Sequence, residues 1–271
     1  MSIPRWPGMT WPVRARIREA VHRLLAAGAD PNAAFINDDG WLQVALFGAA
    51  GIAGDPELTR MLLAAGADPT DERERHHGNE VLYHACEFPD PTCAMLVIDA
   101  GARQEFVDHD LGRALNFPNP EMVEMFCTHG ARASEGNLHQ AVWRRRPPRT
   151  VAALLDAGAP VDGDPAGEEI PLGHACWRGR VQMTRELIQR GAALRFRDGG
   201  SAIGAALHGS RHCNDPEGGP SMRPIDEIPR EPYAAIVQAL LAAGAPVPER
   251  IGEHGARAAM LIAELGIDPP N

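Results

Sequence analysis

The sequence contains no lysine, and aromatic residues make up only 5% of its 271 residues. Sheet cores favour β-branched and aromatic side chains, so this scarcity argues against a fold built from sheets. Alanine and glycine are abundant instead, which favours helices that pack closely through small side chains. The 24 prolines and 28 glycines exclude long uninterrupted helices and predict many short helices joined by turns.

Long apolar segments are also missing. The longest one, residues 44–53, is about half as long as a membrane-spanning helix and contains two glycines. Residues 1–10 lack the apolar core of a signal peptide. The five cysteines form no Cys-x-x-Cys pair, and an odd number in a chain of this size indicates reduced thiols. We therefore expect a soluble cytoplasmic protein without a membrane partner.

Positive charge is in deficit, with a net charge of −10 and a sequence pI of about 5.5. Nucleic acids and anionic membranes bind clustered cations, so the sequence argues against both and favours a partner protein with a basic surface. The only dense basic run extends from Arg144 to Arg149. It either binds an acidic segment or a phosphate, or is an ordinary solvated turn between two helices.

Motifs of catalysis are absent, since no Gly-rich phosphate loop, nucleophile elbow or His-Glu-x-x-His sequence occurs. His208, His212 and Cys213 come nearest to a zinc site, but a structural zinc ion takes four ligands and no matching pair follows. The sequence therefore predicts no enzyme, no metal and no cofactor. The alternative is a metal-binding or enzymatic site built on residues 208–231.

A Gly-Ala pair recurs along the chain with spacings of 38, 35, 29, 28, 33 and 53 residues. Each pair follows the last apolar residues of an amphipathic segment, where a left-handed residue closes the final turn of a helix. The seven glycines are Gly28, Gly66, Gly101, Gly130, Gly158, Gly191 and Gly244.

A second motif, apolar-x-x-Ala, precedes each Gly-Ala pair except the first. Its apolar residue and its alanine lie on one helical face, where the small alanine lets a neighbouring helix approach. Its six copies begin at Phe47, Leu82, Leu111, Leu138, Leu172 and Ile203. Each repeat thus contains a first helix with the apolar-x-x-Ala motif and a second helix that ends at the Gly-Ala pair. Between them, an Asp or Asn that precedes proline predicts the start of the second helix. These cap residues are Asp55, Asp90 and Asn119.

Helix, short turn, helix, Gly-Ala and a polar loop, repeated about every 33 residues, resembles the ankyrin repeat. Residues 170–179, Ile-Pro-Leu-Gly-His-Ala-Cys-Trp-Arg-Gly, are similar to the Thr-Pro-Leu-His-x-Ala opening of that family, and Gly191-Ala192 follows as in its repeat end. The resemblance covers roughly residues 13–245. No copy has the complete Thr-Pro-Leu-His, whose histidine hydrogen-bonds neighbouring loops in the family, so we expect less regular loops.

The resemblance implies an all-α fold, an ankyrin-type α-solenoid of about seven helix-turn-helix repeats with short hairpin-like fingers. We expect one solenoid domain over residues 1–271. Its predicted parts are an N-terminal capping half-repeat at 13–32, six repeats at 33–247 with an insertion at 210–231, and a C-terminal cap at 248–271.

The two shortest spacings predict trimmed fingers around residues 104–109 and 132–137. Terminal repeats of a solenoid need a polar outer face, because no neighbour covers them. The amphipathic segment 249–265 fits this role at one end. At the other end, residues 13–27 supply a single helix that carries Arg14, Arg16 and Arg18.

The resemblance also implies a non-catalytic scaffold, an inhibitor or an adaptor, that recognises a partner protein through its concave groove and finger loops. The expected partner-binding residues of the fingers are Asp38, Asp39, Trp41, His76, His77, Asn79, Glu168 and Glu169. Those at the ends of the first helices are Glu87, Phe88, Trp143, Arg144, Trp177, Arg178 and His208. Exposed Trp and Arg are typical of interface hot spots, although these aromatic residues equally suit packing between repeats. We expect a monomer, with self-association through the Trp-rich faces as the alternative.

Overall fold

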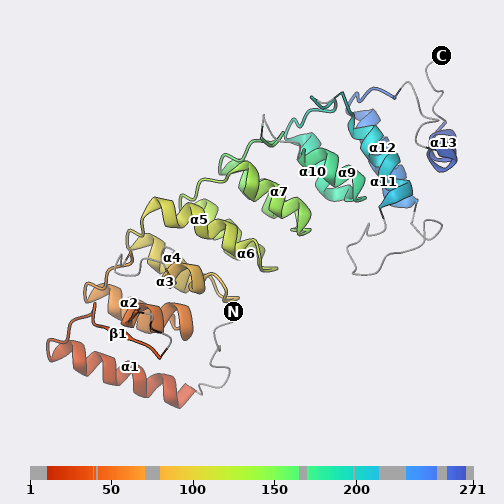
Figure 1. Cartoon of the computed structure of the whole chain (residues 1–271). Coiled ribbons are helices and arrows are strands. Elements are labelled where there is room, and N and C mark those ends of the chain that lie inside the picture. Colours follow the sequence, from red (N-terminus) through yellow and green to blue (C-terminus); the bar gives the residue numbers. More distant parts are fainter. Residues whose placement is uncertain are drawn as a thin grey trace. The chain divides into compact units, whose positions relative to one another are not determined.

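The computed structural model describes residues 11–38, 40, 42–70, 80–164, 170–197, 199–213, 230–248 and 255–266. In these ranges the chain is mainly helical, as predicted, with one two-stranded antiparallel sheet (Figure 1). None of the helices found there combines the length and the apolar character that a bilayer crossing requires. The chain divides into two compact units, residues 1–132 (unit 1) and 133–271 (unit 2). The prediction of a single solenoid with the repeat boundaries given above stays a prediction.

Unit 1 begins with one helix and a hairpin, which are α1 (Trp11–Ala26), β1 (Ala34–Ile36) and β2 (Leu42–Val44). Phe35 of β1 pairs with Gln43 of β2. Three helix pairs follow: the π-helix η1 (Phe47–Ile52) with α2 (Pro56–Ala64), α3 (Glu80–Ala85) with α4 (Thr92–Asp99), and α5 (Gln104–Ala114) with α6 (Pro120–Thr128). The second helix of each pair packs on the first, and η1, α3 and α5 contact one another in that order.

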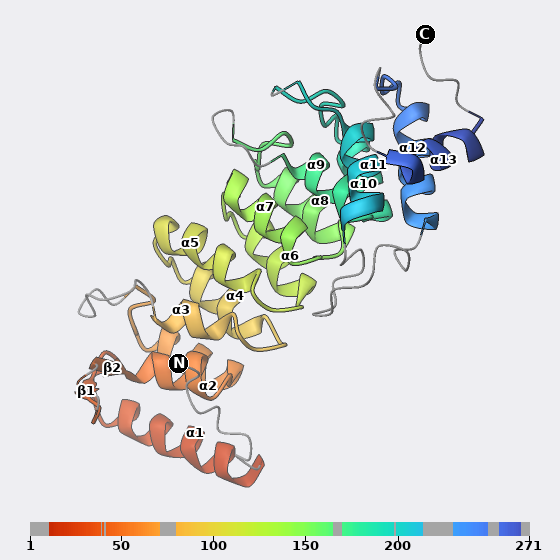
Figure 2. The ribbon, with the colours of Figure 1, turned by 45° about the vertical axis from the view of Figure 1, so that its right-hand side comes forward.

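Unit 2 contains three further pairs and a final helix. The pairs are α7 (Glu135–Trp143) with α8 (Pro148–Asp156), α9 (Pro171–Trp177) with α10 (Val181–Gln189), and α11 (Ala202–His212) with α12 (Glu231–Ala242). The first helices α7, α9 and α11 contact one another in order, and so do the second helices α8, α10 and α12, so the unit has two layers (Figure 2). The final helix, α13 (Gly255–Glu264), packs on α11.

The helix ends follow from the Gly-Ala pairs. All seven glycines have φ between +84° and +100°, the left-handed region that glycine adopts without strain. After α2, for example, the N–H of Gly66 donates to Leu63 O and that of Ala67 donates to Leu62 O, both at 3.0 Å. The same two hydrogen bonds recur at every copy and satisfy carbonyls that a helix end leaves unpaired. The predicted helix ends are therefore confirmed.

The core follows from the apolar-x-x-Ala motif. In all six copies, both the apolar residue and the alanine are at most 4% exposed. Alanine at this place lets helices approach closely, which explains how a chain with so few aromatic residues fills its interior.

Two of the three predicted caps are confirmed. Asp55 Oδ1 accepts from the N–H groups of Glu57 and Leu58, both at 3.1 Å, and Asn119 Oδ1 accepts from the N–H of Met122 at 3.3 Å. Proline occupies the first position of both helices. In the third case α4 begins at Thr92, one residue later than predicted, and Asp90 Oδ1 accepts from the Thr92 N–H at 2.9 Å.

The finger predicted at residues 104–109 is wrong, because these residues form the first turns of α5. Gln104 Nε2 donates to Gly130 O at 2.8 Å and to Asp108 Oδ1 at 2.7 Å, and Asp108 Oδ1 accepts from the Arg132 N–H at 2.7 Å. Side chains of this helical segment thus hold the following loop. The second trimmed finger, predicted at residues 132–137, is only partly correct, since α7 already begins at Glu135 and residues 132–134 alone precede it.

The terminal helices differ in the faces that they expose. Helix α13 lies within the predicted segment 249–265 and is amphipathic, since it buries Leu261 and Ile262 and exposes Met260. The polar outer face expected for the N-terminal helix is only partly correct, because apolar side chains of α1 face outwards. Of the predicted insertion at 210–231, residues 214–229 lie outside the described residues.

Candidate partner-binding surface

Helices α7 and α9, together with the residue that follows α9, carry five side chains that we call the Trp–Arg cluster: His139, Trp143, His174, Trp177 and Arg178. The Arg178 guanidinium carbon lies 4.1 Å from the ring centroid of Trp143 and 5.2 Å from that of Trp177. Both distances are within the range of a cation–π interaction. One cation thus joins the ends of two first helices.

Two imidazoles extend the aromatic surface of the cluster. His139 stacks on Trp143 with a centroid distance of 6.3 Å, and His174 meets His139 edge-on at 5.2 Å. Trp143 is 52% exposed, whereas Trp177 and Arg178 are half-buried. Flat apolar rings combined with a guanidinium group are the composition of protein-interface hot spots, so this surface is suited to bind another protein.

The ends of α7 and α9 place the two tryptophans at equivalent positions. Trp143 and Trp177 are the last residues of their helices. After α9 the chain turns through Gly179, with φ +68°, but after α7 it turns through Arg145, with φ +57°. Arg145 is the only non-glycine residue with positive φ among those that the structure describes, and L-residues pay about 1–2 kcal/mol for this conformation.

We expect Arg145→Gly to be more stable than Arg145→Ala by about 1 kcal/mol, because glycine adopts positive φ without strain. The alanine variant is the matched control, since both substitutions remove the same arginine side chain. Urea unfolding of the two proteins measures the difference. Equal unfolding midpoints would contradict the strained turn.

Residues of α11 and α12 contact the backbone of Trp177. Gly209 of α11 lies so close to the Trp177 carbonyl that a Cβ added at Gly209 would be 2.0 Å from the carbonyl oxygen. The buried Tyr233 of α12 donates its hydroxyl hydrogen bond to the same oxygen at 3.1 Å. The Trp–Arg cluster therefore rests on a rigid support.

The basic run Arg144–Arg149 covers the turn between α7 and α8, residues 144–147, and the first two residues of α8. Arg144 caps the end of α7, the Arg146 N–H donates to Ala141 O at 2.9 Å, and Pro147 precedes α8. Burial, together with the neighbouring charge of Arg144, lowers the pKa of Arg146. The backbone of this run thus agrees with its interpretation as a turn between two helices. Binding of an acidic segment by the exposed side chains of the run stays a prediction.

Unit 1 contains a similar arrangement around Arg113 of α5. Its guanidinium carbon lies 4.4 Å from the ring centroid of Tyr83 and 5.1 Å from that of Phe117. Here Glu87, one of the predicted partner-binding residues, forms an ion pair with Arg113. His84 Nδ1 lies 3.1 Å from the same carboxylate. Glu87 therefore has partners within unit 1.

The other predicted residues are distributed as follows. Phe88 is half-buried, and its ring lies against Gly54 so closely that no Cβ would fit there. Asp38 is exposed between β1 and β2, Arg144 is exposed after α7, and His208 is exposed on α11. Seven predicted residues lie outside the described residues: Asp39, Trp41, His76, His77, Asn79, Glu168 and Glu169.

Sequence reasoning missed five residues of the Trp–Arg cluster and of the arrangement around Arg113: Tyr83, His84, Arg113, His139 and His174. Each occupies one of the two variable positions within the apolar-x-x-Ala motif. Those positions flank the buried face of a first helix, so a search for polar and aromatic residues there would have found them.

The histidine and cysteine side chains that the structure describes were the candidates for metal or thiol chemistry. No three His, Cys, Asp or Glu side chains gather there as a metal site would need, although the rings of His208 and His212 are 4.4 Å apart. Burial raises the pKa of the Cys93 thiol to about 11 and that of Cys176 to about 12, and it raises that of Cys86 well above its usual value. These three thiols therefore stay protonated at neutral pH and are poor nucleophiles.

Helix-turn-helix pairs, each closed by a left-handed glycine, define an ankyrin-repeat fold, as the sequence motifs predict. The crystal structure of the ankyrin repeat domain of Bcl-3, a unique member of the IkappaB protein family, is similar with a TM-score of 0.55 and 24% sequence identity. That match covers 71% of this chain and 88% of the Bcl-3 chain. The crystal structure of the human ASB11 ankyrin repeat domain is similar with a TM-score of 0.56 and 22% identity, over 86% of this chain and 95% of the other. No family model matches the chain.

Proposed function

We propose that the protein is a non-catalytic, monomeric scaffold of the cytoplasm that binds another protein through the Trp–Arg cluster of unit 2. The observation that carries the proposal is the position of Arg178 between Trp143 and Trp177, at the ends of two adjacent first helices. The ankyrin-repeat fold supports a role in protein interaction. An inhibitor or an adaptor would use the same contacts.

The rigid support of the cluster adds to its suitability for binding. Because Gly209 and Tyr233 hold the backbone at Trp177, little conformational entropy is lost when a partner docks there. The exposed Trp143 then contributes apolar area, and the guanidinium of Arg178 contributes positive charge to the contact.

Co-purification from the native host tests this proposal with the double variant Trp143→Ala, Arg178→Ala. We expect the specific partner to be lost from the variant and, once it is purified, to bind at least tenfold more weakly. Met260→Ala is the matched control, because this apolar side chain of α13 is 49% exposed and lies outside the cluster. Equal recovery of the same proteins by the wild type and the double variant would contradict the proposal.

The chemistry of the partner follows from the charge of the whole chain. A net charge of −10 steers basic proteins towards the molecule, so we propose that the partner has a basic surface elsewhere in the contact. Raising the salt concentration should slow association with that partner while changing its dissociation rate much less. An association rate that does not depend on salt would contradict the basic surface but leave the Trp–Arg contact intact.

A further inference from the structure

The outward face of α1 carries a stripe of apolar side chains. Val13, Ile17, Ala20 and Leu24 follow the spacing i, i+4, i+7 and i+11, which places them on one side of a helix. Val13 is 41% exposed, Ile17 36% and Leu24 59%. We call these four residues the α1 stripe. Apolar side chains that line up on one face of a helix usually pack against a neighbouring element, so their exposure needs an explanation.

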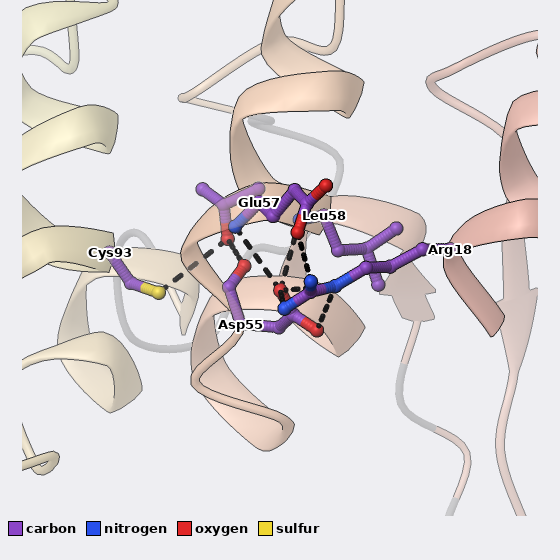
Figure 3. A network of polar contacts seen from close by, with 6 residues as sticks. Arg18, Asp55, Glu57, Leu58 and Cys93 are labelled. Carbon is purple, nitrogen blue, oxygen red and sulfur yellow. Dashed lines mark hydrogen bonds and ion pairs between the residues drawn. The ribbon is translucent and has the colours of Figure 1, made fainter. Parts of the chain in front are cut away.

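Arg18 of α1 forms ion pairs with Asp55 and Glu57 (Figure 3), and these contacts bear on the rotation of α1. Arg18 Nε lies 2.9 Å from Asp55 Oδ2, its Nη2 lies 2.7 Å from Asp55 Oδ1, and its other terminal nitrogen pairs with Glu57. At roughly 100° per residue, Arg18 lies about a quarter to a third of a turn away from the stripe. Since Asp55 is only 2% exposed and also caps α2, this contact holds the arginine face of α1 against α2 and turns the stripe away.

Comparison with the other repeats shows how the residues equivalent to Leu24 are buried. Leu24 is the fifth residue before the alanine of its Gly-Ala pair. The residues at this position in the other six copies are at most 2% exposed: Leu62, Val97, Phe126, Leu154, Leu187 and Leu240. Each of them lies on a second helix that packs on the first helix of its own repeat. In the described part of the chain, no first helix precedes α1.

We propose that the α1 stripe binds an acidic amphipathic helix of another protein, which packs on α1 as the first helix of each other repeat packs on its second helix. The apolar side of such a helix would cover Leu24 as the first helices cover its counterparts in the other repeats. This surface belongs to unit 1, and its use is independent of the function proposed for the Trp–Arg cluster.

The charges of α1 favour an acidic occupant. The helix contains four arginines and one glutamate. The exposed Arg23 pairs with that glutamate, Glu19, at 2.7 Å, and Arg16 is exposed as well. A flanking Asp or Glu of the incoming helix would meet this positive charge. A second copy of the chain would oppose arginine with arginine, and a stripe of this size is small beside the roughly 1,200 Å² or more of a stable dimer.

The first helices of this chain suggest the design of a probe. All of them carry apolar-x-x-Ala on the buried face, so the probe is a fluorescent, stapled helical peptide of about 16 residues with Leu-x-x-Ala on one face and Glu elsewhere. Fluorescence anisotropy with the full chain is expected to give a Kd on the order of 10–100 μM, since the contact is small.

Substitutions in the stripe locate the binding site. Ile17→Glu and Leu24→Glu should each weaken the peptide at least tenfold, whereas His22→Glu, the matched change on the opposite exposed side of α1, should not. A peptide with Lys in place of Glu should bind at least tenfold more weakly than the acidic one. Circular dichroism of each variant must match that of the wild type, which is expected because the substituted side chains are exposed.

Four results would overturn the proposal. The first three are no binding of the acidic peptide at millimolar concentration, binding by Leu24→Glu as tight as by the wild type, and binding of the Lys peptide as tight as of the acidic one. The fourth is a rise of tenfold or more in affinity for the acidic peptide after deletion of residues 2–10. The last result would show that the chain itself competes for the stripe. Sedimentation adds a fifth, since a dimer that Leu24→Glu dissociates would make a second copy the occupant. The Trp143→Ala, Arg178→Ala variant should bind the peptide normally, so failure here and failure of the proposed function can be told apart.

Discussion

Replacing Gly209 by alanine is expected to lower the free energy of unfolding of unit 2 by about 3 kcal/mol, because the new methyl group meets backbone that cannot move aside. The added Cβ would lie 2.0 Å from the Trp177 carbonyl oxygen and 2.7 Å from the carbonyl carbon. To avoid this overlap α11 must shift away from α9. The hydrogen bond from the Tyr233 hydroxyl to the same oxygen would then lengthen or break.

Gly48→Ala is the matched control for this substitution. Gly48 also lies in a first helix, η1, but a Cβ there meets no atom within 4 Å. Alanine is the better helix former, so the control should be neutral or stabilising by up to about 1 kcal/mol. Urea unfolding monitored by circular dichroism compares the two variants. A Gly209→Ala protein as stable as the wild type would contradict the close contact of α9 and α11.

Asp55→Ala has the second largest expected effect, a loss of about 2–4 kcal/mol from the free energy of unfolding of unit 1. The substitution removes the cap of α2, which contributes about 1 kcal/mol. It also removes the carboxylate that holds the half-buried Arg18, and a hydrogen bond to a charged group contributes about 1.5–3 kcal/mol. Asp90→Ala is the control, since the exposed Asp90 accepts a hydrogen bond from the Thr92 N–H at the start of α4 and pairs with no arginine among the described residues, so its loss should cost about 1 kcal/mol.

The effect of Asp55 should depend on pH. Burial raises the pKa of this carboxyl, but the hydrogen bonds from Arg18 and from the Leu58 N–H outweigh burial and leave the pKa below its ordinary value. A carboxylate with a lowered pKa stabilises the folded state above the ordinary value near 4, and this contribution is lost as the pH falls through the folded-state pKa. The difference between wild type and Asp55→Ala should therefore be full at pH 7 and shrink below about pH 4. A difference that stays constant down to pH 3 would show that the charge of Asp55 does not stabilise the fold.

Much of the fold could be predicted because it depends on local signals. A glycine after the last apolar residues determines where each second helix ends, whatever packs around it, and all seven predicted ends are present. The alanine of the apolar-x-x-Ala motif likewise marks the buried face of each first helix. The finger predicted at residues 104–109 failed, since Gln104 and Asp108 bond to the following loop, a contact that no local pattern reveals.

The candidate site was predictable in part. Trp143 and Arg178 were among the residues predicted at the ends of the first helices, but their cation–π contact depends on the packing of α7 against α9. Glu87 was predicted to bind a partner, yet the neighbouring first helix brings Arg113 to its carboxylate. Which charges are neutralised inside the molecule is decided by side chains from different repeats.

The sequence by itself determined the helix-turn-helix repeat, its Gly-Ala ends and its alanine-lined core, because each rests on the conformational preference of one or two adjacent residues. Only the tertiary structure decided which faces stay exposed. The Arg18–Asp55 ion pair joins residues 37 positions apart and sets the rotation of α1, and the contact of Gly209 with Trp177 sets the position of the Trp–Arg cluster. Such contacts depend on where the chain brings distant residues together, and the surfaces available to a partner follow from them.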